Sequence, residues 1–323
     1  MMTRRSAQRG VALITALLIT ALVTVAAVAM ATRQQLDIRR TGNLMEADQA
    51  WQYALGVEAW TRQVLAADDA ARDTLDVLRD PWAAAVPPLV VEGGSVQGSV
   101  EDLQGRFNLN NLVDASGKPV PAQERILTNL LGLLAATDPK LTLNPFLTDV
   151  VVDWIDPQAE VYRSGAEDGD YLGLTPPYRS GNQPLASPSE LLAMAGLSSR
   201  AVAALTPLVA TLPTTGGTVK INVNTAPEMV LMALNDKIAP GMVQQLVGYR
   251  KKTPFDKAED FVKYMKDEFD ITVDVNLVDV KSEYFLVNAL ATIGRTNVQL
   301  YSLLKRNGTD KKITTLSRSI GVY

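Results

Sequence analysis

The sequence of 323 residues contains neither cysteine nor histidine. Without cysteine there can be no disulfide, no thiolate metal site and no cysteine nucleophile. Without histidine the chain lacks the commonest general base and the commonest transition-metal ligand. These absences argue against a hydrolase or a zinc enzyme, and we expect a protein that is not an enzyme. Binding of Ca²⁺ stays open, because calcium needs only oxygen ligands.

An excess of positive charge is also missing. The formal net charge is -4, which argues against a general nucleic-acid surface. The length is enough to bury a sizeable core and to form one large or two ordinary domains.

Charge is absent altogether from residues 11–32, which follow Arg4, Arg5, Arg9 and Gly10. A helix of that length crosses a hydrocarbon core of about 30 Å, so we predict a transmembrane segment over 11–32. The same helix continues without proline to about Leu65. A cleaved signal peptide is the first alternative, but the apolar run is longer than is usual and is followed by more helix.

The small residue Gly10 stands before the apolar run rather than after it. This placement is typical of a prepilin-like leader over 1–10, cut between Gly10 and Val11. An ordinary uncleaved anchor is the alternative.

Small residues form a stripe along the polar half of the predicted helix. Ala47, Ala50, Ala54 and Val57 recur at spacings of three and four, which indicates a helix with one buried face. Small side chains also allow another helix to approach closely. We therefore predict that this stripe binds partner subunits.

Strands are predicted on both sides of a helical region. Residues 87–100 form a strand, a Gly-Gly turn and a second strand, and a short third strand follows at 106–110. Three alternating segments at 283–293, 297–304 and 313–320 complete the sheet. Between them lie helices over 123–136 and 145–155 and two capping boxes, at 187–190 and 225–228.

This order predicts an α+β, pilin-like fold with a long N-terminal helix on an antiparallel sheet. We place the body at 33–112, a large inserted helical domain at 113–282, and the last strands of the body at 283–323.

Two further segments could carry chemistry. Oxygen ligands crowd one irregular stretch, and like carboxylates so close together repel unless a cation neutralises them. The members are Asp153, Asp156, Glu160, Glu167, Asp168, Asp170 and Asn182. A calcium site, a solvated acidic loop and a pair of catalytic carboxylates are the three interpretations.

The second segment, residues 221–255, resembles a helix-hairpin-helix unit of the kind that holds DNA phosphates. Its hairpin lacks the Gly-x-Gly that approaches a phosphate. A structural helical module is the favoured interpretation.

Taken together, the chain resembles the general secretion pathway protein K family, the minor pseudopilins of type II secretion systems. The most specific segments are 9–15, 33–40, 102–110, 153–156, 165–168 and 221–227. The resemblance implies cleavage after Gly10 by a prepilin peptidase, methylation of Val11, and calcium in the inserted domain. It offers Asp156, Glu160, Glu167, Asp168, Asp170 and Asn182 as one set of calcium ligands.

The resemblance further implies a place at the tip of a pseudopilus, with I- and J-type minor pseudopilins, other pseudopilins and inner-membrane secretion components as partners. The protein would cross the bacterial inner membrane once, with most of its chain in the periplasm and no bound nucleic acid. Thr15 stands where most pilins carry glutamate, which suits a topmost subunit. A membrane-anchored DNA-binding or DNA-uptake protein is the alternative function.

Overall fold

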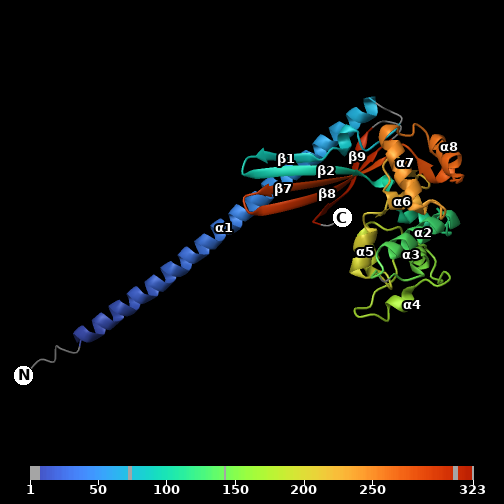
Figure 1. The fold of residues 1–323 in the computed structure, drawn as a ribbon. Coiled ribbons are helices and arrows are strands. Elements are labelled where there is room, and N and C mark those ends of the chain that lie inside the picture. Colours follow the sequence, from blue (N-terminus) through green and yellow to red (C-terminus); the bar gives the residue numbers. More distant parts are fainter. Residues whose placement is uncertain (1–7, 72–74, 142, 308–311, 322–323) are drawn as a thin grey trace, which may run out of the picture.

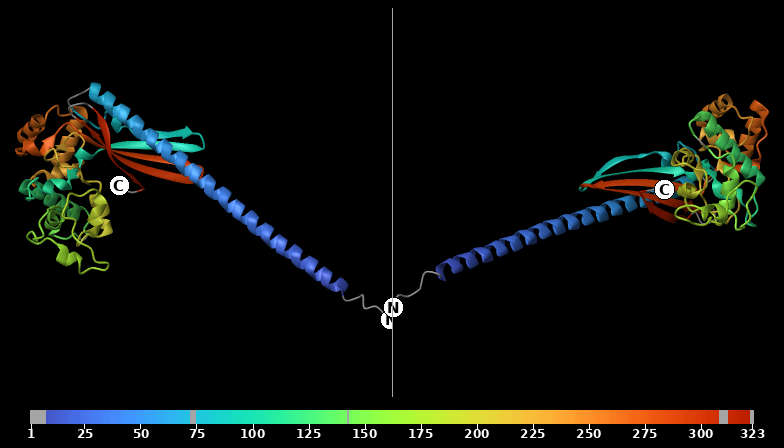
Figure 2. Two further views of the ribbon diagram at one scale, coloured as in Figure 1. Left: turned by 180° about the vertical axis from the view of Figure 1, so that it is seen from behind. Right: turned by 90° about the horizontal axis from the view of Figure 1, so that it is seen from below.

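The protein is described by a computed structural model that covers residues 8–71, 75–141, 143–307 and 312–321. One helix, α1 (Gln8–Ala71), dominates its shape. Figures 1 and 2 show that its N-terminal half projects away from everything else, while its C-terminal half lies along a sheet. The helix begins three residues before and ends six residues after the predicted Val11–Leu65, because the flanking residues also favour helix.

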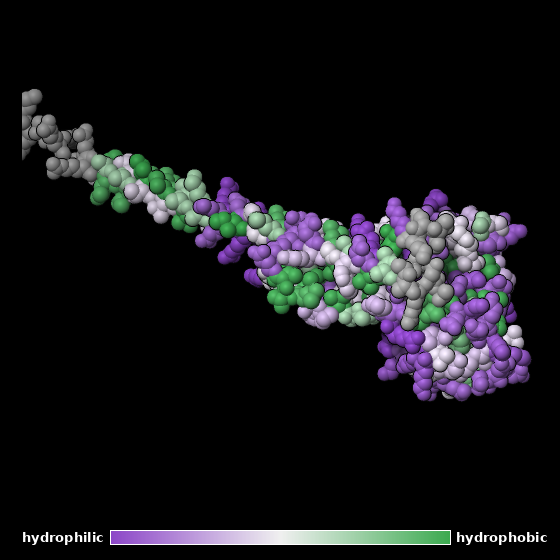
Figure 3. Space-filling model, turned by 90° about the horizontal axis from the view of Figure 1, so that it is seen from above, coloured by the Kyte–Doolittle hydropathy of each residue, from purple (hydrophilic) through white to green (hydrophobic). Residues whose placement is uncertain are grey.

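The projecting half of α1 is apolar on all sides. Its residues are exposed, and it is the one helix of the described chain that is long and apolar enough to cross a membrane. In Figure 3 the visible face of this part is hydrophobic to neutral in colour, and hydrophilic side chains appear further along the helix toward the body. A helix that is apolar all round needs an apolar surrounding such as lipid.

The sheet of the body has five antiparallel strands in the order β1-β2-β7-β8-β9. They are β1 (Val86–Val91), β2 (Gly94–Asp102), β7 (Tyr284–Ile293), β8 (Thr296–Arg306) and β9 (Ile313–Ile320). Gly93, at a φ of 81°, forms the turn between β1 and β2 as predicted. Because β2 and β7 are neighbours in the sheet, everything between Asp102 and Tyr284 is an insertion at one end of these two strands.

The small-residue stripe of α1 packs against this sheet. Ala50 and Ala54 are fully buried in a cluster with Ala289, Ala291 and Leu300. Val57 fits the sheet because β2 has a glycine opposite it: a Cβ on Gly98 would lie 2.6 Å from Val57 Cγ1. Ala47 and Val57 are half-buried at the same face. The prediction that this stripe binds partner subunits is therefore corrected, since intramolecular packing uses it.

A buried carboxylate fixes the same helix to the far edge of the sheet. Glu58, fully buried, accepts hydrogen bonds from Ser302 on β8 (2.7 Å) and from Thr315 (2.8 Å) and Arg318 (2.7 Å) on β9. Burial alone would raise the pKa of Glu58, but these donors outweigh it and lower the pKa to about 2. The carboxylate is therefore ionised and ties α1 to two strands.

The inserted domain is mainly helical and has its own large hydrophobic core. Its helices are α2 (Pro121–Thr137), α3 (Leu147–Ile155), α4 (Asp168–Tyr171), α5 (Ser199–Leu205), α6 (Glu228–Ala233), α7 (Pro240–Lys252) and α8 (Ala258–Phe269). Short 3₁₀ segments are η1 (Pro81–Ala83, in the body), η2 (Leu103–Gly105), η3 (Leu109–Leu112), η4 (Pro188–Ala193) and η5 (Val275–Leu277). Two small parallel pairs connect them, β3 (Phe107–Asn108) with β4 (Val209–Ala210) and β5 (Ile221–Asn222) with β6 (Val278–Asp279).

The predicted third strand of the body belongs instead to the inserted domain. Residues 107–108 pair with β4, and the amides of Asn108, Asn110 and Asn111 donate to the backbone carbonyls of Leu212 and Val219. The boundary of the insertion therefore lies near Leu103 rather than at 113. An alternating pattern of five residues predicts a strand but does not indicate which sheet the strand joins. The prediction was therefore wrong about the pairing partner, which is decided by the tertiary structure.

The helix–sheet contact yields the first prediction. Ala54→Leu should lower the stability of the body by about 1–3 kcal/mol, because the sheet leaves no room for the added carbons. Gly56 lies on the exposed side of the same helix, where a Cβ meets no atom within 4 Å. Gly56→Ala should therefore raise stability by about 0.5–1 kcal/mol. Thermal unfolding of the full chain in detergent micelles, followed by circular dichroism, measures both. Equal effects of the two substitutions would contradict this packing.

Candidate metal site and domain junction

The acidic loop brings three acceptor oxygens around one hydroxyl. Ser180 Oγ lies 2.7 Å from Glu167 Oε2, 2.6 Å from Asn182 Oδ1 and 3.2 Å from Asp168 Oδ1. A serine hydroxyl has a single proton and can satisfy only one of these acceptors. Glu167 Oε2 and Asp168 Oδ1 each also accept from a backbone amide, and Asp168 Oδ2 pairs with Arg179 at 3.0 Å. A hard cation would add a positive charge to this cluster of oxygen ligands.

Burial adds to this surplus of negative charge. Glu167 is 4% exposed, and its second oxygen, Oε1, has no hydrogen-bond partner among the described residues. Asp156, at the C-terminal end of α3, is also buried, and burial and then the charge of Glu167 raise its pKa to about 6. A cation bound beside Glu167 and Asp156 would remove both costs.

The fit to calcium differs among the predicted ligands. Glu167, Asp168 and Asn182 meet at Ser180 Oγ, and Asp156 lies close enough to Glu167 for the charge of Glu167 to raise its pKa. Asp170 serves as a helix cap, because its Oδ2 accepts from the Glu167 amide at 3.1 Å. Glu160 lies exposed on the loop and forms no hydrogen bond or ion pair with the other members among the described residues. Four members of the set therefore remain as candidate ligands, although Asp156, Glu167 and Asp168 do not bring three carboxylate oxygens within 4.8 Å of one another in this structure.

Asp153 has a structural role in the same region. Its Oδ1 accepts from the Tyr162 amide at 2.8 Å, and Gly165 lies so close to its Oδ2 that any Cβ would be 2.0 Å away. Burial, with the charges of Glu167 and Asp156, raises the pKa of Asp153 to about 7. This carboxyl holds the loop against α3.

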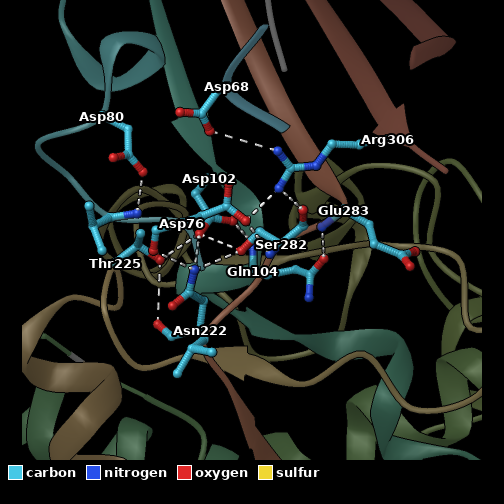
Figure 4. A network of polar contacts seen from close by, with 12 residues as sticks. Asp68, Asp76, Asp80, Asp102, Gln104, Asn222, Thr225, Ser282, Glu283 and Arg306 are labelled. Carbon is cyan, nitrogen blue, oxygen red and sulfur yellow. Dashed lines mark hydrogen bonds and ion pairs between the residues drawn. The ribbon is translucent and has the colours of Figure 1, made fainter. Parts of the chain in front are cut away.

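The polar network that joins the two domains was not predicted (Figure 4). At its centre is Asp102, the last residue of β2, which is 5% exposed. Its Oδ2 accepts from Ser282 Oγ (2.7 Å), from Asn222 Nδ2 (3.1 Å) and from Thr225 Oγ1. Asp102 comes from the body, Asn222 and Thr225 come from the insertion, and Ser282 lies where the chain returns to the body.

Thr225 was predicted to open a helix as part of a capping box. In the structure α6 begins after Pro227 and has no side-chain cap, because the Thr225 hydroxyl donates to Asp102 instead. The other predicted capping box, Ser187 with Glu190, is present. Of the two sequence patterns predicted to be capping boxes, the one at Ser187 forms a capping box and the one at Thr225 forms a long-range hydrogen bond instead.

Arg306, at the end of β8, supplies the positive charge of this junction. Its guanidinium pairs with Asp76 and donates to the Ser282 carbonyl at 2.6 Å, and it lies 3.9 Å from an oxygen of Asp68. Among the described residues, only Asp68, Asp76 and Asp80 bring three carboxylate oxygens within 4.8 Å of one another. Burial raises the pKa of Asp76, against the opposing charge of Arg306.

One basic residue of the helix-hairpin-helix-like segment, Arg250, is turned inward, whereas Lys237, Lys251 and Lys252 are exposed. Arg250 on α7 is 7% exposed and donates to the carbonyls of Val223 (2.5 Å) and Ala226 (2.7 Å). Asn224 clamps the same turn by exchanging hydrogen bonds with the backbone of Phe255. The segment is therefore tied together by its own polar side chains, as the structural interpretation expected.

A long apolar N-terminal helix that continues onto an antiparallel sheet places the protein in the pilin-like class. Family models described as type II secretion system protein K match residues 105–214 and 221–266. Curated proteins named type II secretion system protein K are 36% identical in Pseudomonas aeruginosa (98% of this chain, 94% of theirs) and 34% identical in Aeromonas hydrophila (97% of each). The chain therefore belongs to the type II secretion system protein K family, whose members are minor pseudopilins.

A solved structure agrees with this assignment. The GspK-GspI-GspJ complex of enterotoxigenic Escherichia coli contains a chain that matches with a TM-score of 0.75 and 25% identity. The match covers 88% of this chain and all of that one. The family is a structural component of a secretion system, and the apolar helix fits the single-pass anchor of such a protein.

The junction yields the second prediction. Burial raises the pKa of Asp102 to about 6, although Thr225 and Ser282 oppose this. Because the pKa of Asp102 in the folded protein exceeds the ordinary aspartate value of 3.8, the stability from proton binding is present below about pH 3.8 and is lost as the pH rises through about 6. Thr225→Val should therefore cost about 1.5–3 kcal/mol at pH 8, where it removes a bond to an ion, and about 1 kcal/mol at pH 5.

Thr61→Val is the matched control, measured in the same thermal melts. Thr61 is fully buried, and its hydroxyl has no hydrogen-bond partner among the residues that the structure describes. Its replacement should be neutral or stabilising at both pH values. An equal cost of Thr225→Val at pH 5 and pH 8 would show that Asp102 is not the titrating partner.

Proposed function

We propose that this minor pseudopilin caps the tip of the periplasmic pseudopilus together with I- and J-type minor pseudopilins and supports protein export across the outer membrane. The observation that carries the proposal is the match, over 88% of this chain, to one subunit of the solved GspK-GspI-GspJ complex. The proposed orientation follows from Arg4, Arg5 and Arg9, because positive charge before a membrane helix favours the cytoplasmic side.

The shape of the molecule supports a place at the tip. The inserted domain lies beyond the C-terminal end of α1, at the opposite end from the membrane segment (Figures 1 and 2). A subunit stacked above would have to share that space. Thr15 also carries no charge that could pair with a subunit above, and its hydroxyl lies 3.0 Å from the carbonyls of Val11 and Ala12 in its own helix.

The surface proposed for the partner subunits is the outward face of α1. Ile38, Met45 and Trp60 lie there with 64%, 69% and 46% of their surface exposed, and Gly56 lies between the last two. These residues are opposite the stripe that packs on the sheet. Exposed apolar residues that follow one helix face are typical of an interaction site. The prepilin peptidase is a further proposed partner, acting between Gly10 and Val11, with methylation of Val11 after the cut.

Co-expression with I- and J-type pseudopilins and a prepilin peptidase tests this function. The intact mass of the purified complex should show one copy of this chain, beginning at a methylated Val11. Gly56→Leu should reduce recovery of both partners at least about tenfold, a loss of about 1.4 kcal/mol. Gly248→Leu, on an exposed face of α7 where a Cβ also meets nothing within 4 Å, should leave recovery unchanged.

Two outcomes would overturn this model. A chain that keeps residues 1–10 in the secreting host would show that the leader is not processed. Several copies of this chain per complex, or copies along the shaft of isolated pseudopili, would contradict capping.

We further propose that the acidic loop binds calcium through Asp156, Glu167, Asp168 and Asn182. The support is the set of three acceptors around the Ser180 hydroxyl and the buried, unpartnered oxygen of Glu167. The bound ion would neutralise these carboxylates and hold the loop on α3. In this role calcium is structural, and it fixes the shape of the inserted domain.

Calcium should raise the melting temperature of the full chain at pH 7.5 relative to chelator, because a ligand of the folded state stabilises by about 2.7 kcal/mol at 100 times its Kd. Glu167→Gln should abolish the rise. Glu160→Gln removes the same charge from the exposed part of the loop and should preserve it. Identical melting of the unmodified chain with chelator and with millimolar calcium would exclude the site.

A further inference from the structure

A shallow hollow of about 320 Å³ lies between the C-terminal half of α7 and α8, floored by aromatic rings. The rings of Tyr249 and Tyr264 stack with centroids 4.4 Å apart, and Phe255 lies 5.5 Å from the first and 5.6 Å from the second. Tyr249 is 39% exposed, so part of its side chain is open to solvent. Figure 1 places α8 at the end of the molecule remote from the membrane helix.

Acidic residues line this hollow. They are Asp256, Asp260, Asp267 and Glu268, all exposed, and Lys263 is the single cation of the lining. None of the four carboxylates forms an ion pair within the described parts of the chain, although the pairs Lys266–Asp270 and Arg200–Asp138 show that exposed pairs do form elsewhere. The hollow therefore has a net formal charge of -3 (four carboxylates less one ammonium) next to partly exposed tyrosine side chains.

Two of these carboxylates occupy unfavourable positions for helix stability. Asp267 and Glu268 lie in the last turn of α8, which ends at Phe269. The carbonyl end of a helix carries partial negative charge, and acidic side chains there are destabilising. Residues that reduce stability without an internal partner are the ones expected at a binding surface.

The geometry favours a flat organic cation over a metal ion. The four carboxylates do not bring three oxygens within 4.8 Å of one another, so they do not converge as metal ligands do. A guanidinium group stacks on aromatic faces and pairs with carboxylates at its edges, which is the combination this hollow presents. We propose that the hollow binds an arginine side chain displayed by another protein.

This inference does not depend on capping or on calcium. It adds to the proposed function a docking point at the membrane-distal end, where a protein that meets the end of the filament would approach. The partner is defined by its chemistry: an exposed arginine on a surface segment, attracted by the acidic rim and oriented by the ring face.

N-acetyl-L-arginine amide is the probe, titrated into the full chain in detergent micelles. The chain is labelled with 3-fluorotyrosine, and Tyr249→Phe and Tyr264→Phe identify the two ¹⁹F resonances. Both resonances should shift in a saturable way with half-saturation at about 1–10 mM, the range of one weakly held side chain. The citrulline analogue has the same shape without the charge, and its concentration at half-saturation should be at least about tenfold higher.

Charge variants separate binding from folding. Asp267→Asn combined with Glu268→Gln should weaken arginine binding at least about fivefold, while the melting temperature stays equal or rises, because the helix end loses unfavourable charge. Lys263→Gln should strengthen binding by removing a competing cation. Glu259→Gln, on α8 but outside the lining, should change neither.

Equal shifts with arginine and citrulline, or undiminished binding in the double variant, would overturn the proposal. Failure of the I- and J-type partners to assemble, with arginine binding intact, would count against the proposed function alone.

Discussion

The structure depends on how a few buried carboxylates at the domain junction are stabilised. Asp102 ends β2 and receives donors from the insertion and from the point where the chain returns to the body. Asp76 and Arg306 add an ion pair at the end of β8. Buried charges are costly unless they are paired and hydrogen-bonded, so these residues can coexist only when both domains are folded and correctly placed. The inserted domain is thereby held at a fixed position on the sheet.

The long helix α1 has two roles, as a membrane anchor and as part of the core of the body. One half of α1 is apolar all round, and the other half presents Ala50 and Ala54 to its own sheet and Glu58 to two further strands. With the inner face used in this way, only the outward face remains for other subunits. The direction of the anchor, the body and the inserted domain are therefore rigidly related, as a filament subunit needs.

Negative charge is handled differently at three places in the molecule. At Glu58 several donors and an arginine keep the carboxylate ionised. At the loop around Glu167, three acceptor oxygens share the Ser180 hydroxyl and Glu167 Oε1 has no partner among the described residues, which is why a cation is proposed there. Beside α8 the carboxylates are exposed and lie next to partly exposed tyrosine side chains, which suits a cation carried by a partner. Burial and the number of nearby donors distinguish these environments, although the residue types are the same.

The sequence alone determined the features that depend on local pattern. The uncharged run after Gly10, the turn at Gly93 and the three alternating C-terminal segments each follow from spacing or composition, and each is present in the structure. The acidic loop was also visible in the sequence, because its residues lie close together along the chain.

Tertiary structure decided what depends on pairing between distant residues. It placed residues 107–108 in the insertion, turned the stripe of Ala47, Ala50, Ala54 and Val57 onto the body's own sheet, and gave the Thr225 hydroxyl to Asp102 rather than to a helix cap. Partners separated by more than a hundred residues leave no periodic signal in the sequence, because their contact arises only when the chain has folded.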